Sequence, residues 1–446
     1  MKIIIAGAGE VGYHLAKQLS SEEHDITVID VDQNILSRTD SSTDVMTLHG
    51  SSTSIKMLEN ANVEETDLCV AVTSSEAINI NTAILAKRMG AKKTIARVNN
   101  GEYVNPKNTD VFRSLGVDNM VYPEELAAIE VVKLIERAAA TDILDFEDGK
   151  LSLLGLKLDR GVPIIDRTLK QIAAEYSSID FRIVALHRGF QTIIPYGDDI
   201  FRPNDQLFVI SKSEGMEKII QLTSKDKKKL NNIMILGGGK IGRLVAKMLE
   251  KKIDVKLIES NHDKSVELAD YLEESLVIHG DGRDLDLLAQ EGIIDMDGFV
   301  AVTENAETNI ITCLMAKHLG VSKTIAQVDN VDYIALTQTI GLDSLINKKL
   351  IAANSITRFI KKSNVVATAS LQGIDADIFE FIARDGSKIT KSKIKDLKFP
   401  KNAIIGGIIR GGEGIITVGD TQILAEDKVV VFALPGAVSD VQKFFN

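Results

Sequence analysis

The strongest constraint in this sequence is a motif that occurs twice in equivalent surroundings. Residues 2–6 form an apolar run that leads into G-x-G-x-x-G at residues 7–12, and residues 233–236 lead into the same motif at 237–242. An apolar strand followed by this motif and an amphipathic helix is the fingerprint of a dinucleotide-binding fold. One match is weak because glycine is common, but two matches after equivalent strands predict an internal duplication.

The duplication extends well beyond the glycines. Residues 70–104 align with residues 300–334 without a gap, and about half of the positions are identical. Short β-rich runs alternate with helical patterns, which predicts a parallel sheet covered on both faces. We expect strands at 2–6, 25–30, 44–48, 68–72 and 93–98, helices at 11–20, 54–60, 76–89 and 104–115, and second-half strands at 232–236, 254–259, 275–278, 297–302 and 323–328.

A smaller, β-rich segment follows each large unit. Strand-like runs at 151–154, 181–186 and 206–210 surround a helical stretch at 169–176, and the run from 195 to 207 is echoed from 417 to 429. We therefore predict an α/β protein with two Rossmann-like, doubly wound parallel-sheet units, each followed by a small α+β domain. The expected domains are 1–122 and 230–346 for the Rossmann-like units, 123–140 and 347–363 for helices that lead out of them, and 141–224 and 364–446 for the small domains.

Composition excludes several classes of protein. The net charge of −11 disfavours general nucleic-acid binding, and no uncharged apolar run approaches the length of a membrane span. The chain opens on a core strand, so we expect no signal peptide. Cys69 and Cys313 lie in apolar segments of different halves, which argues against a disulfide framework and suits a reducing cytosol. The basic cluster at 225–229 is interpreted as a solvated linker.

The glycines predict a phosphate site. Gly7 would allow a tight turn, Gly9 would let a phosphate approach the backbone, and Gly12 would allow close packing of the helix. The helix N-terminus then offers free N–H groups to a pyrophosphate. Gly237, Gly239 and Gly242 would do the same in the second half. The alternative is a tight strand-to-helix turn that binds nothing.

An acidic residue follows at the end of the second strand in each half. Asp30 could accept hydrogen bonds from a ribose diol, and its charge would repel a 2′-phosphate, which favours NAD or an adenine nucleotide over NADP. Glu259 holds the matching place. A solvated strand-end acid is the alternative, and nearby Asp32 is better explained as a turn or cap residue.

Polar residues at the ends of other strands extend the candidate site. Thr73 and Thr303 end the shared Val-Ala-Val-Thr run, where they could reach a ribose or phosphate, although a helix N-cap explains them nearly as well. Ser51 and Asp281 follow the glycines that end the third strands, near an expected adenine, with a plain turn as the alternative. His49 and His279 precede those glycines and are interpreted as structural.

The two halves differ at the end of the fifth strand. Arg97 in the first half can bind phosphate through two N–H groups, whereas Gln327 in the second half supplies no charge. The two sites should therefore respond differently to the number of phosphates. The alternative for Arg97 is a surface ion pair in solvent.

Catalytic patterns are missing from the sequence. It contains no P-loop motif, no nucleophile elbow, no cysteine redox pair and no histidines at metal-ligand spacing. We therefore expect a protein that is not an enzyme and holds no metal. Two alternatives stay open: a soluble NAD-dependent oxidoreductase with duplicated Rossmann units, and a scaffold that binds nothing.

Together these residues resemble the RCK family (regulator of K⁺ conductance, also called KTN). The resemblance rests on the first glycine motif after an N-terminal strand, Asp30, the Val-Ala-Val-Thr run, Ile-Ala-Arg-Val at 95–98 and a small domain after each unit. It implies binding of NAD(H), or of ATP and ADP, by the large units, and sensing or assembly by the small domains. It also implies a homo-oligomeric ring, cytoplasmic and peripheral to the membrane, that gates an integral-membrane potassium transporter of the Trk type.

The resemblance also implies ligand-binding residues in both halves. Two departures from the family pattern weaken parts of it: Ser51 stands where an Asp is common, and Gln327 replaces the Arg of the first half. Two unlike sites in one chain could supply opposing inputs to a gate. The candidate residues are Gly7, Ala8, Gly9, Glu10, Val11, Gly12, Asp30, Ser51, Thr73, Ser74 and Arg97 in the first half, and Gly237, Gly238, Gly239, Lys240, Ile241, Gly242, Glu259, Asp281, Thr303 and Glu304 in the second.

Overall fold

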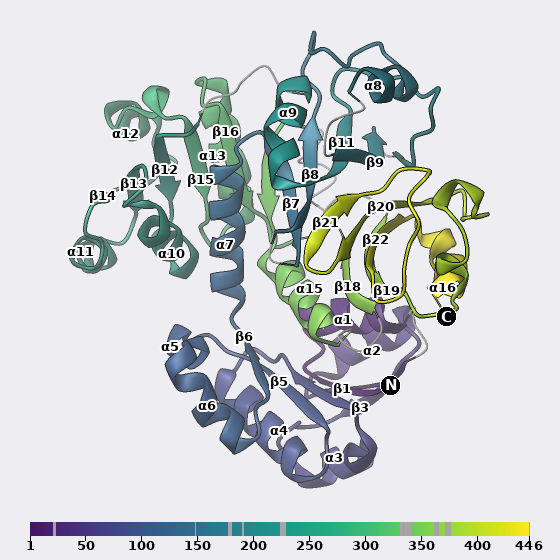
Figure 1. Cartoon of the computed structure of the whole chain (residues 1–446). Helices are drawn as coiled ribbons and strands as arrows, with labels where there is room; N and C mark the ends of the chain where they lie inside the picture. Colours follow the sequence, from purple (N-terminus) through teal and green to yellow (C-terminus); the bar gives the residue numbers. More distant parts are fainter. Residues whose placement is uncertain are drawn as a thin grey trace. The chain divides into compact units, whose positions relative to one another are not determined.

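The chain forms two compact units in the computed structural model (Figure 1). The first consists of residues 1–127 and 347–360, and the second of residues 128–346 and 361–446. The predicted linker at 225–228 and the predicted end of the second exit helix at 361–363 lie outside the described residues. The structure describes residues 1–20, 24–147, 149–176, 181–189, 191–223, 229–330, 333, 340–360, 365–370 and 376–445.

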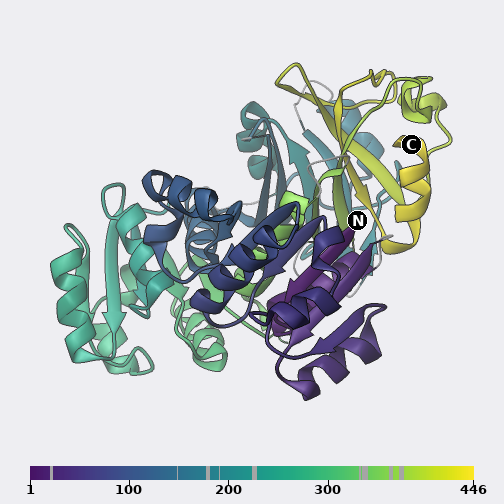
Figure 2. The ribbon, with the colours of Figure 1, turned by 90° about the horizontal axis from the view of Figure 1, so that it is seen from below.

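The first unit is built on a six-stranded sheet with the order β3-β2-β1-β4-β5-β6. Every neighbouring pair in this sheet is parallel, which confirms the predicted doubly wound arrangement. The order reverses between β1 and β4, and a ligand crevice is expected at such a switch point. Figure 2 shows these strands, in purple and blue, from a second direction. The strands are β1 (Lys2–Ala6), β2 (Asp25–Asp30), β3 (Met46–His49), β4 (Leu68–Ala71), β5 (Lys93–Arg97) and β6 (Asn119–Val121).

The helices of this unit agree with the prediction at most positions. The predicted helix at 104–115 is two helices, because Asn105 is extended and caps a new helix that begins at Pro106. One helix, at 33–42, was not predicted, because it is polar and buries little apolar surface. The helices are α1 (Glu10–Ser20), α2 (Gln33–Ser42), α3 (Ile55–Asn60), α4 (Glu76–Arg88), α5 (Gly101–Val104), α6 (Pro106–Leu115) and α7 (Pro123–Glu136).

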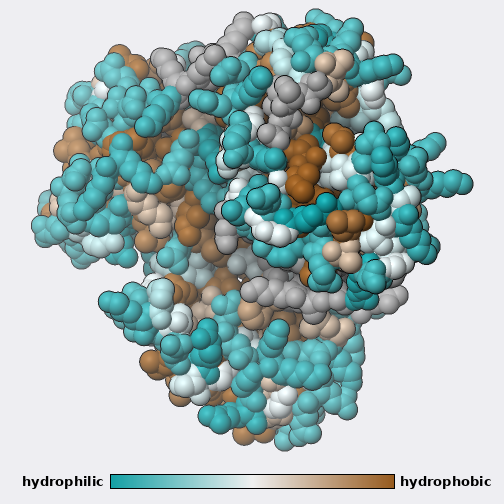
Figure 3. All heavy atoms as spheres, viewed as in Figure 1, coloured by the Kyte–Doolittle hydropathy of each residue, from teal (hydrophilic) through white to brown (hydrophobic). Residues whose placement is uncertain are grey.

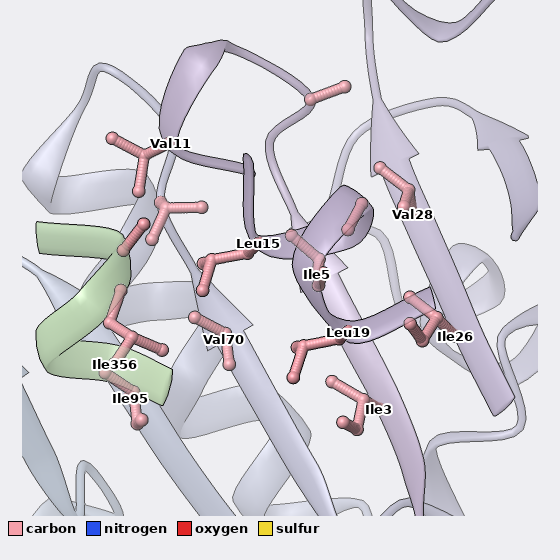
Figure 4. Close-up of a cluster of buried hydrophobic side chains, with 14 of the residues drawn as sticks. Ile3, Ile5, Val11, Leu15, Leu19, Ile26, Val28, Val70, Ile95 and Ile356 are labelled. Atoms are coloured by element: carbon pink, nitrogen blue, oxygen red, sulfur yellow. The ribbon is translucent and has the colours of Figure 1, made fainter. Parts of the chain in front are cut away.

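A helix from the far end of the sequence completes the core of the first unit. Helix α15 (Lys348–Ile360) packs against α1, and its Ala352, Ala353 and Ile356 belong to the same buried cluster as the residues of β1 and β4. Figure 4 shows Ile356 among Leu15, Val70 and Ile95. The sequence predicts this helix but not that it packs on the first repeat.

The second unit repeats the parallel sheet, with the order β14-β13-β12-β15-β16-β17. All its neighbouring pairs are parallel, as in the first sheet. The sixth strand of each sheet was not predicted, because it has only three residues. The elements are β12 (Asn232–Leu236), α10 (Lys240–Leu249), β13 (Asp254–Glu259), α11 (His262–Tyr271), β14 (Leu276–His279), α12 (Leu285–Gln290), β15 (Gly298–Ala301), α13 (Ala306–His318), β16 (Lys323–Gln327) and β17 (Ser344–Ile346).

Two five-stranded antiparallel sheets form the small domains, in the orders β10-β9-β11-β8-β7 and β18-β19-β22-β20-β21. Their duplication is confirmed by a repeated ion pair, Arg188 with Asp205 at 2.7 Å and Arg410 with Asp427 at 2.6 Å. The elements are β7 (Ala140–Phe146), β8 (Leu151–Lys157), α8 (Leu169–Glu175), β9 (Phe181–Arg188), β10 (Gln191–Ile193), β11 (Gln206–Ser211), α9 (Ser213–Thr223), β18 (Val365–Ser370), β19 (Asp377–Ile382), β20 (Ala403–Arg410), β21 (Glu413–Ile416), β22 (Lys428–Ala433) and α16 (Val438–Phe445).

Hydrophilic side chains cover most of the first unit on the face shown at the bottom of Figure 3. Within the described part of the chain, none of the helices combines the length and the apolar character that crossing a bilayer requires.

Both cysteines are buried and unpaired, and burial raises the pKa of the Cys69 thiol to about 12.

Candidate functional site

The first glycine loop lies between β1 and α1 in a tight turn. Gly7 has φ +105°, and a Cβ there would lie 2.9 Å from the Thr73 amide nitrogen. A Cβ on Gly12 would lie 1.8 Å from the Gly7 carbonyl oxygen, so the helix meets its own loop too closely for any side chain. A Cβ on Gly9 would meet nothing within 4 Å. The geometry therefore matches the turn expected at Gly7 and the close packing expected at Gly12, and the space at Gly9 is open.

A cavity of about 420 Å³ opens above this loop, at the switch point of the sheet. Nine of the eleven candidate residues of the first half line it, while Ala8 and Gly12 lie beneath the loop surface. Apolar side chains from α2 and α4 and two lysines of α15 complete the walls. The lining candidates are Gly7, Gly9, Glu10, Val11, Asp30, Ser51, Thr73, Ser74 and Arg97, and the further lining residues used below are Ile35, Ile78, Lys348 and Lys349.

Asp30 holds the loop as well as lining the cavity. Its Oδ2 accepts a hydrogen bond from the Ala8 N–H at 2.6 Å, and its Oδ1 accepts one from the Asp32 N–H at 2.9 Å. A carboxylate has about four lone-pair sites, so acceptor capacity remains for a diol. Asp32 is the N-cap of α2, as expected, and accepts from the Asn34 N–H at 2.8 Å.

Thr73 is positioned by a buried asparagine that the sequence reasoning missed. Asn79, only 1% exposed, accepts hydrogen bonds through Oδ1 from the Thr73 N–H at 2.8 Å and from its hydroxyl at 2.7 Å. Its amide group donates to the carbonyl oxygens of Thr73 and Arg97, at 3.0 and 2.9 Å. Asn79 therefore ties the ends of β4 and β5 together beside the cavity.

The alternative interpretation of Thr73 as a helix cap is wrong. Ser75 is the N-cap of α4, and in the second half Asn305 is the N-cap of α13. Asn309 repeats every contact of Asn79, to Thr303 and to the Gln327 carbonyl oxygen. The signal was present in the sequence, since this asparagine is identical in the two aligned segments.

Arg97 ends β5 and faces the cavity. Among the described residues it forms no ion pair, and its buried Nε has no hydrogen-bond partner. The solvent ion pair considered as an alternative is therefore not found. A buried N–H of a guanidinium without an acceptor is costly, and an anionic ligand would remove that cost.

The second glycine loop has the same backbone but tighter surroundings. Gly237 has φ +104°, and a Cβ on Gly242 would lie 1.9 Å from the Gly237 carbonyl oxygen. Glu259 accepts from the Gly238 N–H at 3.0 Å, as Asp30 does from Ala8. A Cβ on Gly238 would lie 2.3 Å from Leu268 Cδ1, so the alanine of the first half would fit here only if the leucine side chain shifted.

The polar candidates around the second loop are engaged with protein partners. Asp281 binds Arg283 through contacts of 2.6 to 3.1 Å, and this pairing lowers the pKa of Asp281 to about 2. Gln327 is 4% exposed and donates to Asp329 at 3.4 Å. Lys240 and Ile241 begin α10, and Glu304 is exposed after Thr303.

The two strand-end histidines are structural, as expected. His49 Nε2 lies 3.0 Å from the Val31 carbonyl oxygen, and His279 Nε2 lies 3.2 Å from that of Ser260. Each bridges the end of the third strand to the loop after the second. In the described parts of the chain, no group of His, Cys, Asp and Glu side chains is arranged to hold a metal.

Comparison with known families identifies the group to which the chain belongs. The TrkA-N domain model matches residues 3–123 and 233–348, and the TrkA-C domain model matches residues 153–224 and 378–446. The chain is therefore a member of the TrkA family, with two copies of each domain, and the resemblance to RCK proteins is confirmed.

Full-length relatives and solved structures agree with this assignment. The Trk system potassium uptake protein TrkA homolog 1 of Methanosarcina mazei is 34% identical and covers 100% of both chains. The Trk system potassium uptake protein TrkA of Halomonas elongata is 30% identical, over 100% of this chain and 99% of its own.

Among solved structures, the GsuK RCK domain has a TM-score of 0.60 at 16% identity, over 100% of this chain and 94% of that chain. The GsuK channel bound to NAD has a TM-score of 0.59 at 16% identity, over 100% and 78%. At this identity the two structures establish the fold alone.

Proposed function

We propose that the protein is a regulatory subunit that binds NAD(H) or an adenine nucleotide and gates a potassium-uptake transporter of the Trk type. The observation that carries the proposal is the cavity above the first glycine loop, which is lined by the N-terminus of α1, by the Asp30 carboxylate and by Arg97, whose Nε has no hydrogen-bond partner among the described residues. These are the groups that an adenine nucleotide requires for its pyrophosphate and ribose.

The relatives support the regulatory part of the proposal. Their names place them in potassium uptake systems, and one structure with the same fold is described as bound to NAD and another, with a TM-score of 0.51, as bound to ADP. On this basis all twenty-one candidate residues are proposed as ligand contacts or loop positions. The domain boundaries 1–122, 123–140, 141–224, 230–346, 347–363 and 364–446 are proposed with them.

In the proposed mechanism the nucleotide is a ligand and is not consumed. A gate needs a ligand that binds one conformation better than another, and two unlike sites provide two inputs to the same equilibrium. We propose that the chain acts at the cytoplasmic face of the membrane, within a homo-oligomeric ring that docks on the integral-membrane transporter subunit.

Calorimetry with NAD, NADH, ATP and ADP tests the proposal directly. The matched variants are Gly9→Ala and Gly239→Ala, since a Cβ at either position meets nothing within 4 Å and the fold should be preserved. Each added methyl lies where a phosphate would approach, so each should weaken its own site by about tenfold or more. A wild-type chain whose stability none of the four ligands raises would contradict the proposal.

The same preparation separates the regulatory function from the oxidoreductase alternative. Incubation with NADH and a panel of carbonyl compounds should give no turnover, whereas steady oxidation of NADH would falsify the regulatory reading. Potassium flux measured with and without each nucleotide, in membranes that contain the transporter subunit, then tests the gating step.

A further inference from the structure

Residues from the other repeat line the first cavity beside its glycine loop. Lys348 and Lys349 begin α15, the helix that leads out of the second Rossmann-like fold, yet both line the cavity of the first. Lys349 Nζ lies 2.6 Å from Glu10 Oε2, and Glu10 is the first residue of α1, directly after Gly9. The pair therefore spans the position next to the expected pyrophosphate.

This ion pair can be exchanged at little cost. The side chains of Lys349 and Glu10 are 28% and 48% exposed, and pairs of this exposure contribute little to stability. A terminal phosphate carries more negative charge than a carboxylate and offers the ammonium group the same kind of charge-assisted bond. Arg97 already presents an unpartnered Nε at the same cavity.

The counterpart helix of the first repeat could not supply this group. Val121 and Ile346 hold equivalent places, since their carbonyl oxygens accept from the Val98 and Val328 N–H groups at 2.9 and 2.8 Å. Counting onward, Glu124 is the counterpart of Lys349. If α7 packed on the first glycine loop in place of α15, Glu124 would face Glu10 with like charge. Of the two exit helices, only α15 therefore has a positive charge to offer at this position.

We propose that Lys349, assisted by Lys348, is the residue that recognises the terminal phosphate of a nucleoside triphosphate in the first site. The incoming phosphate replaces Glu10 as the partner of Lys349, so the site distinguishes nucleotides by their number of phosphates. This inference rests on the proposed nucleotide-binding function. It makes the first site a product of both repeats and places its phosphate contact on the helix that continues toward the second small domain.

Calorimetry on the full-length chain tests this role. A Gly239→Ala background weakens the second site, so that the first site dominates the signal at low ligand concentration. In this background ATP, ADP and NAD are titrated against Lys349→Gln, Glu10→Gln and the control Lys17→Gln. Lys349→Gln should weaken ATP binding about tenfold and NAD binding less than about twofold. Glu10→Gln should tighten ATP binding, because it releases Lys349. Lys17, exposed on α1 and outside the cavity lining, should change nothing.

Each other outcome has a distinct meaning. An unchanged ATP-to-ADP affinity ratio in Lys349→Gln, or an equal loss for all three ligands, would show that the lysine only supports the fold. Binding of NAD without binding of ATP would also overturn the inference. If the background chain binds none of the ligands while its thermal unfolding is normal, the proposed function itself fails.

Discussion

The two Rossmann-like repeats keep the same scaffold and differ at the end of the fifth strand. Both have the same strand order, the same asparagine between β4 and β5 or β15 and β16, and a carboxylate that holds the glycine loop. At the cavity, however, Arg97 is replaced by a buried glutamine. The asparagine that ties the two strand ends together is therefore identical in the two repeats, while the residue that ends the fifth strand differs.

A lysine shared by the repeats shows how context changes the same residue. Lys93 is exposed at the start of β5, where its ammonium lies 5.7 Å from the centre of the Phe359 ring. Lys323, its counterpart in β16, is 4% exposed and donates to the Ala140 carbonyl oxygen and to the Ser344 hydroxyl at 3.0 Å. The packing of β7 beside β17 brings the Ala140 carbonyl oxygen to the second lysine.

The largest expected effect tests the shared scaffold. Asn79→Ala and Asn309→Ala each remove four hydrogen bonds at a buried position, and each should lower the local free energy of opening by about 3 kcal/mol. Native-state hydrogen exchange of the amides in β4, β5, β15 and β16 measures this quantity. Because the contacts are repeated, the two losses should agree within about 1 kcal/mol. A loss in one repeat only would break the comparison.

An intermediate effect concerns the buried lysine. Burial lowers the pKa of Lys323 from 10.5 to about 8. The charges of Asp343 and Asp142 act to raise this pKa, and the charge of Lys317 acts to lower it further. Between these two pH values the unfolded chain binds more protons than the folded one, so this lysine makes stability rise with pH there. The stability of wild type relative to Lys323→Met should therefore increase by roughly 2 kcal/mol from pH 8 to 10.5.

Thermal unfolding of the two proteins across this range measures the difference. Lys93→Met, at the exposed counterpart, is the matched control. A difference for Lys323→Met that does not change with pH would mean that its ammonium is not buried in solution.

The smallest effect tests the tightness of the second loop. Gly238→Ala should cost about 1–2 kcal/mol, because its Cβ meets Leu268 Cδ1 at 2.3 Å and Glu259 Oε2 at 2.9 Å. The register counterpart of Leu268 is the smaller Thr39, so Leu268→Thr should restore part of the loss in the double variant. Thermal unfolding of the single and double variants measures both steps. Additive losses would show that the leucine is not the obstacle.

Much of the fold could be read from the pattern of the chain. The repeated glycine motif and the alternation of strands and helices predict two parallel sheets, because short β-rich runs separated by helical patterns fit strands joined by crossover helices. The missed elements include β6, β17 and α2, which are short or polar. In the first small domain β7, β10 and α9 were also not predicted. The part of the candidate site that could be predicted consists of residues at the carboxyl ends of strands. These strand ends meet at one edge of the parallel sheet, so their side chains are brought together.

What local sequence determines about this protein is the backbone of each repeat. Gly7 and Gly12 leave no space for a side chain. The central strands are buried on both faces when helices cover both sides of a parallel sheet. What the tertiary structure alone decides is which distant groups share the cavity. Lys349 reaches it because α15 packs its apolar face on α1, and that choice depends on the shape and charge of the surface offered by another repeat, which no local pattern encodes.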